Sequence, residues 1–183
     1  LTTLLRRHVR RQGESVRFRF TGKSGVDHDV TISDPEVLQV VSALRRRSDE
    51  SGRLLAYRTP EGWTDLNSAT VNGYLAPLFD TEFTAKDFRT WHATVLAAEA
   101  LALSEEPGDT VASRKRAIRA AVKEVAGYLG NSPAVARASY IDSRVLDRYE
   151  SGVTIDPGLA RAHQGAQGRA AAEAAVLELL DGE

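Results

Sequence analysis

Three short stretches of the chain hold the side chains that could do chemistry. The first, FTGKSG (Phe20–Gly25), places a lysine between a glycine and a serine, a setting that often meets a phosphate. A nucleotide-binding P-loop would need a second glycine five residues before Gly22, and that position holds Arg17, so the backbone cannot wrap a triphosphate. The other stretches, KDFRTW (Lys86–Trp91) and GNSPAVARASYI (Gly130–Ile141), combine cations with an asparagine and a tyrosine.

The composition excludes several other kinds of site. The chain has 183 residues and no cysteine, which rules out disulfides, zinc–thiolate sites and a thiol nucleophile. The four histidines are scattered, and no two of them have the i, i+4 spacing of a helical zinc site. The GxSxG pattern of a serine hydrolase does not occur. The remaining candidates for a functional site are cationic side chains and tyrosines.

These stretches resemble the catalytic domain of bacterial DNA topoisomerase IB, the poxvirus-type enzyme, which shares its catalytic fold with tyrosine recombinases. The resemblance runs from Leu1 to about Gly152 and rests on four motifs in the same order. They are a lysine in a GK hairpin turn, an arginine in KxxRT, a histidine or asparagine, and a tyrosine in SYI. The matching residues are Lys23, Arg89, Asn131 and Tyr140. Tyrosine recombinases usually have a histidine where this chain has Lys86, which favours a topoisomerase.

The resemblance implies that Tyr140 attacks a DNA phosphodiester and forms a 3′-phosphotyrosyl link. Arg89 and Asn131 would then bind the phosphate, and Lys23 would protonate the leaving 5′-hydroxyl. The chemistry of these side chains agrees, since a covalent intermediate divides one difficult step into two and arginine offers two parallel N–H donors. The family relaxes supercoiled duplex DNA, and the resemblance implies no metal ion, no ATP and no other cofactor.

Each of these residues also has a plain structural interpretation. Lys23 could be an ordinary turn lysine, Arg89 a helix-capping or structural ion-pair arginine, Asn131 the N-cap before Pro133, and Tyr140 a core aromatic. Two other classes of protein stay open, a fragment of a tyrosine recombinase and a non-catalytic DNA-binding module that keeps the fold. The family also uses an earlier arginine on the phosphate, and the chain begins in the segment that follows it. We therefore expect this arginine to be missing and the chain alone to be weak or inactive.

Charge is distributed unevenly along the chain, although the formal net charge is −1. Residues 1–23 carry seven basic side chains and one acidic, and residues 112–148 carry eight basic and three acidic. Two basic segments can form one face that binds duplex DNA, or they can be ordinary solvated surfaces. The side chains that we expect to contact DNA are Lys86, Arg17, Arg19, Arg114, Lys115 and Arg137. Duplex DNA is the expected partner, and we expect a monomer.

The periodicity of apolar residues predicts an α+β, mainly α, protein with a small three-stranded antiparallel sheet followed by a helical bundle. By resemblance this is the DNA breaking-rejoining (tyrosine recombinase-like) catalytic fold. Strands are predicted at 16–20, 28–32 and 54–58, and the hairpin between the first two carries Lys23. Helices are predicted at 35–47, 67–79, 84–103, 113–129, 133–139, 143–151 and 169–180.

The chain divides into three parts by composition. We predict a catalytic domain over residues 1–152, a flexible linker rich in glycine and polar residues over 153–168, and a C-terminal helix within 169–183. No apolar run approaches the length that spans a membrane, and no secretory signal opens the chain. The expected location is the cytoplasm, at the nucleoid.

Overall fold

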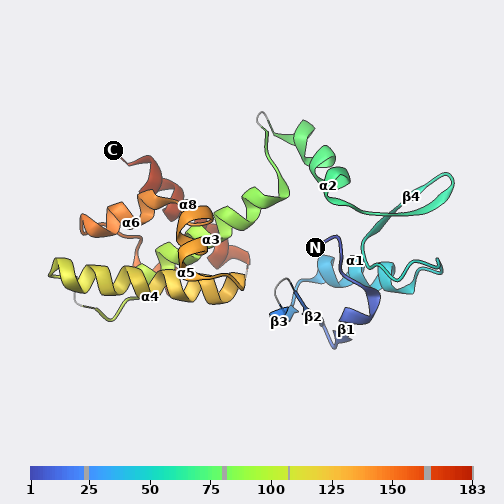
Figure 1. Ribbon diagram of the computed structural model, residues 1–183, viewed down its shortest axis with the longest axis horizontal. Helices are drawn as coiled ribbons and strands as arrows, with labels where there is room; N and C mark the ends of the chain where they lie inside the picture. The colour runs from blue at the N-terminus through green and yellow to red at the C-terminus, as the bar shows by residue number, and fades with distance from the viewer. Residues whose placement is uncertain (23–24, 80–81, 107, 163–165, 183) are drawn as a thin grey trace. The chain divides into compact units, whose positions relative to one another are not determined.

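The computed structural model describes residues 1–22, 25–79, 82–106, 108–162 and 166–182. The chain forms two compact units, Leu1–Thr84 and Ala85–Glu183, each with its own hydrophobic core (Figure 1). Lys23, which the sequence places in a hairpin turn, lies outside the described residues.

The first unit is built on a three-stranded antiparallel sheet in the order β1-β2-β3. Its elements are η1 (Arg6–His8), β1 (Val9–Gln12), β2 (Ser15–Thr21), β3 (Asp27–Ile32) and α1 (Pro35–Arg46). Side chains alternate across a strand, so Val16 and Phe18 of β2 lie on one face, and both are buried. They form one core with Val41 of α1, while Arg17 and Arg19 lie on the opposite face of the sheet.

The composition of this sheet differs from our prediction. The predicted strand at 54–58 is β4 (Ala56–Thr59), which pairs with β5 (Gly62–Asp65) in a separate two-stranded sheet. The third strand of the main sheet is β1, which the sequence did not reveal because Val9 is its only apolar residue. The unit continues with α2 (Ser68–Leu75) and η3 (Ala76–Leu78), where we predicted one helix.

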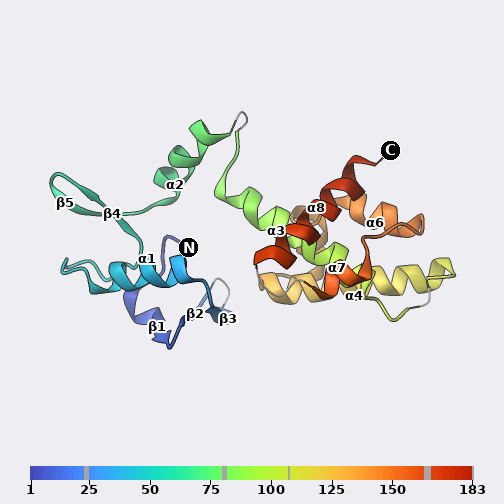
Figure 2. The ribbon, with the colours of Figure 1, turned by 180° about the vertical axis from the view of Figure 1, so that it is seen from behind.

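The second unit is a helical bundle, as predicted. Its helices are α3 (Ala85–Ala102), α4 (Val111–Leu129), α5 (Pro133–Ser139), α6 (Ser143–Glu150), α7 (Pro157–Arg161) and α8 (Ala166–Asp181). In both views α4 runs along one side of the bundle, and α3, α6 and α8 lie to its other side (Figures 1 and 2). The core is made of small and branched apolar side chains from all six helices.

Local signals in the sequence set the ends of α4 and α5. The Thr110 hydroxyl accepts a hydrogen bond from the Ser113 amide and caps the start of α4. Gly130 ends the helix in the left-handed conformation, with φ of 66°, which a side chain would make costly. Ser132 then caps α5, whose first residue is Pro133, so the two helices are joined by a turn of fixed geometry.

The stretch 153–168, which we predicted to be a flexible linker, contains the short helix α7. Ile155 and Ala160 are buried in the core of the second unit, and α7 packs against α3 and α8. Asp156 caps α7 through the Gly158 and Leu159 amides and is followed by Pro157. This helix start was hidden by a composition rich in glycine and polar residues.

Arg47, the residue after α1, is a buried cation in the first unit. Its side chain is fully buried and donates hydrogen bonds to the Leu54 and Arg53 carbonyls, each 2.5 Å long. It also bonds the carboxylates of Asp49 and Asp65. Burial, followed by the nearby Arg6 charge, lowers the pKa of Arg47. The guanidinium therefore holds together the loop between α1 and β4.

Replacing Arg47 with Ala should destabilise the first unit by about 3 kcal/mol, because the buried Leu54 carbonyl loses its donor and the Asp49 and Asp65 carboxylates lose their shared cation. The matched control is Arg46→Ala, which removes the neighbouring, exposed arginine and should change stability by less than about 0.5 kcal/mol. Hydrogen exchange of the β1 and β2 amides in urea would measure this unit alone. Equal effects of the two substitutions would contradict a structural role for Arg47.

Candidate active site

Tyr140 lies at the end of α5 and is half-buried beside the core of the second unit. The Ala136 carbonyl accepts hydrogen bonds from the Tyr140 and Ile141 amides, and the Ile141 side chain is buried. The backbone on which the phenol is carried is therefore fixed on both sides.

Two cations from α3 lie over the Tyr140 ring. The Arg89 guanidinium carbon is 5.1 Å from the ring centroid, and the Lys86 Nζ atom is 5.8 Å from it. The two residues are three positions apart, so they lie on one face of the helix about one turn apart. Both side chains are exposed, which leaves them available to an anion that approaches the phenol.

Arg89 is held in place by the end of α4. Its Nη2 atom donates to the Leu129 carbonyl over 2.6 Å, and this carbonyl is its one hydrogen-bond acceptor among the described residues. The last carbonyls of a helix lack partners within the helix and carry partial negative charge, which suits a guanidinium. One arm of Arg89 is thus anchored, and its other N–H groups can bind a ligand.

Asn131 lies in the turn between α4 and α5, two residues after Leu129. Its Nδ2 atom is buried and has no hydrogen-bond partner among the described residues. A buried donor without a partner costs about 1–3 kcal/mol. The structure therefore brings Tyr140, Arg89 and Lys86 into contact, and Asn131 adjoins them through the α4–α5 turn.

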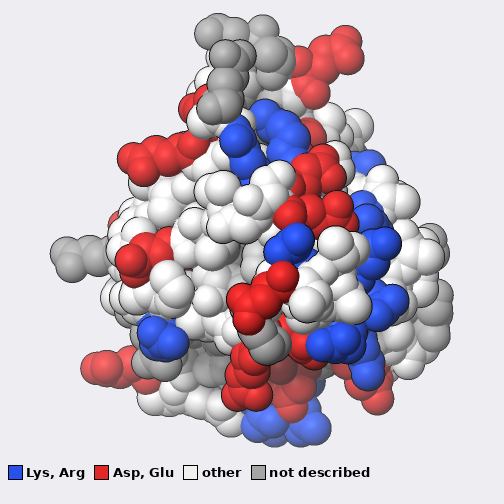
Figure 3. Space-filling model, turned by 90° about the vertical axis from the view of Figure 1, so that its left-hand side faces the viewer, with Lys and Arg blue, Asp and Glu red and all other residues white. Residues whose placement is uncertain are grey.

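The other basic residues of this unit that we predicted to contact DNA differ in setting. Arg137 is exposed on α5, one turn before Tyr140. Arg114 donates to the Gly108 carbonyl over 2.6 Å, and it and Lys115 lie near the start of α4. At 1.5 Å per residue they are about 22 Å from Leu129 along the helix. The face in Figure 3 shows basic side chains interleaved with acidic ones rather than a continuous basic surface.

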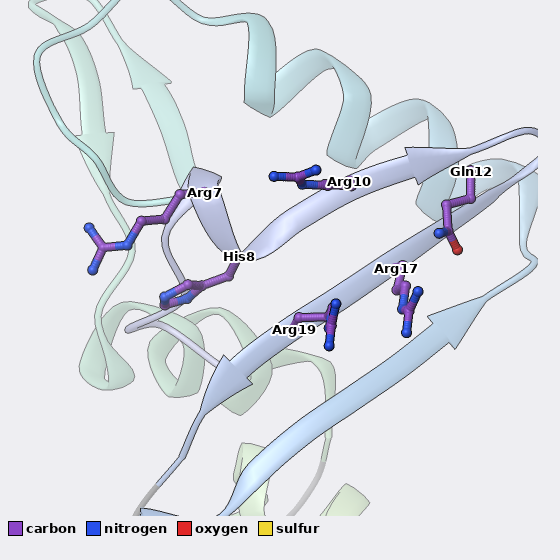
Figure 4. A pocket seen from close by; sticks show the side chains of 6 residues that line it. All are labelled: Arg7, His8, Arg10, Gln12, Arg17 and Arg19. Atoms are coloured by element: carbon purple, nitrogen blue, oxygen red, sulfur yellow. The ribbon is translucent and has the colours of Figure 1, made fainter.

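The predicted DNA contacts of the first unit, Arg17 and Arg19, lie on the outer face of the sheet (Figure 4). Both bond the Asp29 carboxylate of β3, Arg17 at 2.5 Å and Arg19 at 3.2 Å. The hydrogen bond from Arg17 lowers the pKa of Asp29. The hairpin that carries Lys23 is closed by the Gly22 amide, which donates to the Val26 carbonyl over 2.7 Å.

Thr94 and Asp142 support Tyr140 and were not found by sequence reasoning. The buried Thr94 hydroxyl donates to the Thr90 carbonyl of its own helix at 3.0 Å, lies 3.4 Å from the Tyr140 carbonyl, and accepts the Asp142 amide at 3.1 Å. The Asp142 carboxylate caps α6 at the Arg144 amide and also binds the Arg144 side chain. Thr94 looks like one more small residue in an alanine-rich helix, and only the contact between distant segments reveals it.

A third pair near the site joins α3 to α4. The His92 Nε2 atom is 3.1 Å from the Tyr128 hydroxyl, and the two rings are 5.1 Å apart. His92 is one turn beyond Arg89, and Tyr128 precedes Leu129. This pair therefore ties together the same two helix segments that hold Arg89.

Comparison with known proteins places this arrangement in a family. Residues 1–155 match the family described as "Eukaryotic DNA topoisomerase I, catalytic core". The chain belongs to this family. It is also 30% identical over 159 residues to the DNA topoisomerase 1B of Acanthamoeba polyphaga mimivirus. This alignment covers 82% of the chain and 46% of the viral protein, so the chain spans about half the length of that relative.

These matches support the type IB topoisomerase domain that the motifs predicted. Neither match is a bacterial protein, and the bacterial branch stays a prediction. In the described ranges, no helix has the length and hydropathy needed to cross a membrane. Over the same residues, no three histidine, aspartate or glutamate side chains are grouped so that they could hold a metal ion.

Replacing Thr94 with Val should expose the role of its hydroxyl in this topoisomerase domain. The shape is kept, but the Asp142 amide loses its acceptor, which should destabilise the second unit by about 1–3 kcal/mol. Thr90→Val is the matched control, because within the described ranges the Thr90 hydroxyl bonds only the Lys86 carbonyl of its own helix. Amide hydrogen exchange at Asp142 should accelerate in Thr94→Val alone. Unchanged exchange there would contradict the supporting role.

Replacing Asp142 with Ala should cost about 1 kcal/mol at neutral pH, since α6 loses its cap. The hydrogen bond from Arg144 lowers the pKa of Asp142 in the folded protein. The stabilisation of the folded protein by the ionised Asp142 carboxylate is therefore complete above the ordinary carboxyl pKa of about 3.9. It is lost as pH falls through the lower pKa of the folded protein. Thermal unfolding followed through the α6 amides should show that the unchanged protein and Asp142→Ala become equally stable at acidic pH. Asp147→Ala, on the exposed side of α6, should show no such dependence.

Proposed function

We propose that this protein acts as a type IB DNA topoisomerase, which relaxes supercoiled duplex DNA by cutting and resealing one strand. The observation that carries the proposal is the pair of cations over the Tyr140 ring, with Arg89 anchored on one arm and open on the other. Asn131, two residues after the Leu129 carbonyl that anchors Arg89, has a buried amide without a hydrogen-bond partner among the described residues and is a further candidate donor. Family membership supplies the substrate class.

In the proposed reaction the Tyr140 oxygen attacks the scissile phosphorus, and the bond from phosphorus to the 5′-oxygen breaks. The phenol gives up its proton to solvent, and Lys23 donates a proton to the departing 5′-oxygen, which leaves as a hydroxyl. Arg89, Lys86 and Asn131 stabilise the charge that builds on the non-bridging oxygens. The 3′-phosphotyrosyl link keeps the energy of the broken bond, so religation is the same step in reverse.

The remaining features of the proposal follow from this chemistry. Duplex DNA is the substrate, the protein works as a monomer at the nucleoid, and no step needs a metal ion or ATP. We also propose that the protein belongs to the bacterial branch of the family.

Replacing Tyr140 with Phe tests the proposal, because it removes one hydroxyl and nothing else. The unchanged protein should leave a detergent-trapped DNA adduct that mass spectrometry maps to Tyr140, and its relaxation of supercoiled plasmid, which we expect to be weak, should persist in EDTA. Tyr140→Phe should lose relaxation and adduct entirely while its affinity for duplex DNA stays within about twofold, since only the nucleophile is removed.

Tyr149→Phe is the matched control. This tyrosine belongs to the same unit, is half-buried like Tyr140 and packs against the same core, and the loss of its hydroxyl should leave the adduct intact. An adduct that maps to Tyr128 or Tyr149, or one that persists in Tyr140→Phe, would show that the nucleophile is a different residue. Duplex binding with no adduct in any protein would instead indicate a DNA-binding module.

A further inference from the structure

The outer face of the three-stranded sheet holds a basic pocket of about 420 Å³. We call it the arginine face. Figure 4 shows its side chains gathered over η1, β1 and β2. The residues that line it are Arg7, His8, Arg10, Gln12, Arg17 and Arg19. All of them belong to the first unit, so the arginine face is built from different residues than the Tyr140 site.

The arginine face has more positive charge than its one carboxylate can balance. Asp29 is paired with Arg17 and Arg19. Within the described part of the chain, neither Arg7 nor Arg10 forms an ion pair. Four arginines therefore share a single acidic partner, and the pocket attracts anions.

The strand register makes this arrangement costly for the sheet itself. Arg10 of β1 and Arg17 of β2 are direct cross-strand partners on the same face. Like charges in that position destabilise a sheet, whereas a pair of opposite charges would stabilise it. An anion bound between Arg10 and Arg17 would remove this repulsion. Anion binding would therefore explain why two arginines face each other here, whereas the stability of the sheet does not.

Asp29 shows what kind of anion the arginines can hold. Arg17 donates to both of its oxygens, through Nε at 2.6 Å and Nη2 at 2.5 Å, in the two-pronged geometry that also suits phosphate.

We propose that the arginine face binds a phosphate group other than the scissile one, through Arg10 and Arg7 with Arg17 and Arg19 held beside them. The group is a backbone phosphate of duplex DNA or a free phosphate anion. The DNA form of the proposal rests on the proposed function, whereas the free-anion form does not.

Replacing Arg10 with Gln tests the site, and Arg11→Gln is its matched control. The two residues are neighbours on β1 and lose the same charge, and both line a second basic pocket, but Arg11 lies on the other face of the strand and does not line the arginine face. Binding of a short labelled duplex to Tyr140→Phe protein is measured from 50 to 200 mM KCl. Arg10→Gln should flatten the slope of log affinity against log salt by about 0.9, the change expected for one lost phosphate contact. Arg11→Gln should leave the slope near that of the parent.

Asp29→Asn is a second variant with the opposite expected sign. Loss of the internal carboxylate frees Arg17 and Arg19, so duplex affinity should rise severalfold. Asp27→Asn is its control, because Asp27 accepts a hydrogen bond from Thr21 and contacts no arginine of the pocket. A fall in affinity for Asp29→Asn would contradict the proposal.

Titration with inorganic pyrophosphate, followed through the arginine side-chain NMR signals, separates the two sources of phosphate. A slope change in Arg10→Gln without saturable pyrophosphate binding assigns the site to DNA. Pyrophosphate binding that is lost only in Arg10→Gln, with an unchanged slope, assigns it to a free anion. Equal slopes in Arg10→Gln and Arg11→Gln, with no loss of pyrophosphate binding, would overturn the proposal. Failure of the parent to bind duplex at all would count against the proposed function. The pyrophosphate titration would still show whether the arginine face binds a phosphate group.

Discussion

Close packing of α3 against α4 is the constraint on which the candidate active site depends. Ala93, Ala97 and Ala98 of α3 and Ala117 and Ala121 of α4 are at most 2% exposed, and all belong to one core. Because alanine has a single methyl group, helices that meet through it can approach closely. The last turn of α4 is therefore near enough to accept a hydrogen bond from α3. Larger side chains in these positions would move the helices apart and separate the cation from its anchor.

The same contact explains how an exposed arginine can be well placed. A long side chain on a surface loses rotamer entropy when it binds a ligand, and that loss weakens binding. Arg89 has already lost part of it, since the Leu129 carbonyl holds one arm and the Tyr140 ring lies beneath the guanidinium. Thr94 fixes the chain just after Tyr140, because its hydroxyl accepts a hydrogen bond from the Asp142 amide. Contacts with backbone groups thus hold the residues of the site in place before any DNA is bound.

Sequence reasoning succeeded where local signals are strong and failed where a contact joins distant segments. Helix α5 was predicted with its observed bounds because Ser132 and Pro133 mark its start. Strand β1 was missed because an edge strand with one apolar residue has no alternation to detect. Arg17 was predicted as a simple DNA contact, and its pairing with Asp29 depends on a strand register that charge counting does not show. The role of Lys23 still rests on its motif, since it lies outside the described residues.

The register of β1 and β2 also limits where residues can be inserted or deleted in this part of the protein. The ladder begins at the pair of Gln12 and Ser15 and leaves only Gly13 and Glu14 in the turn. A single-residue insertion within β2 would exchange its two faces, so that Val16 would face solvent and Arg17 the core. Insertions and deletions that survive selection should therefore fall in the turn, outside the ladder. Gly13, with φ of 59°, lies in this turn, where an added residue leaves the alternation of buried and exposed side chains in β2 unchanged.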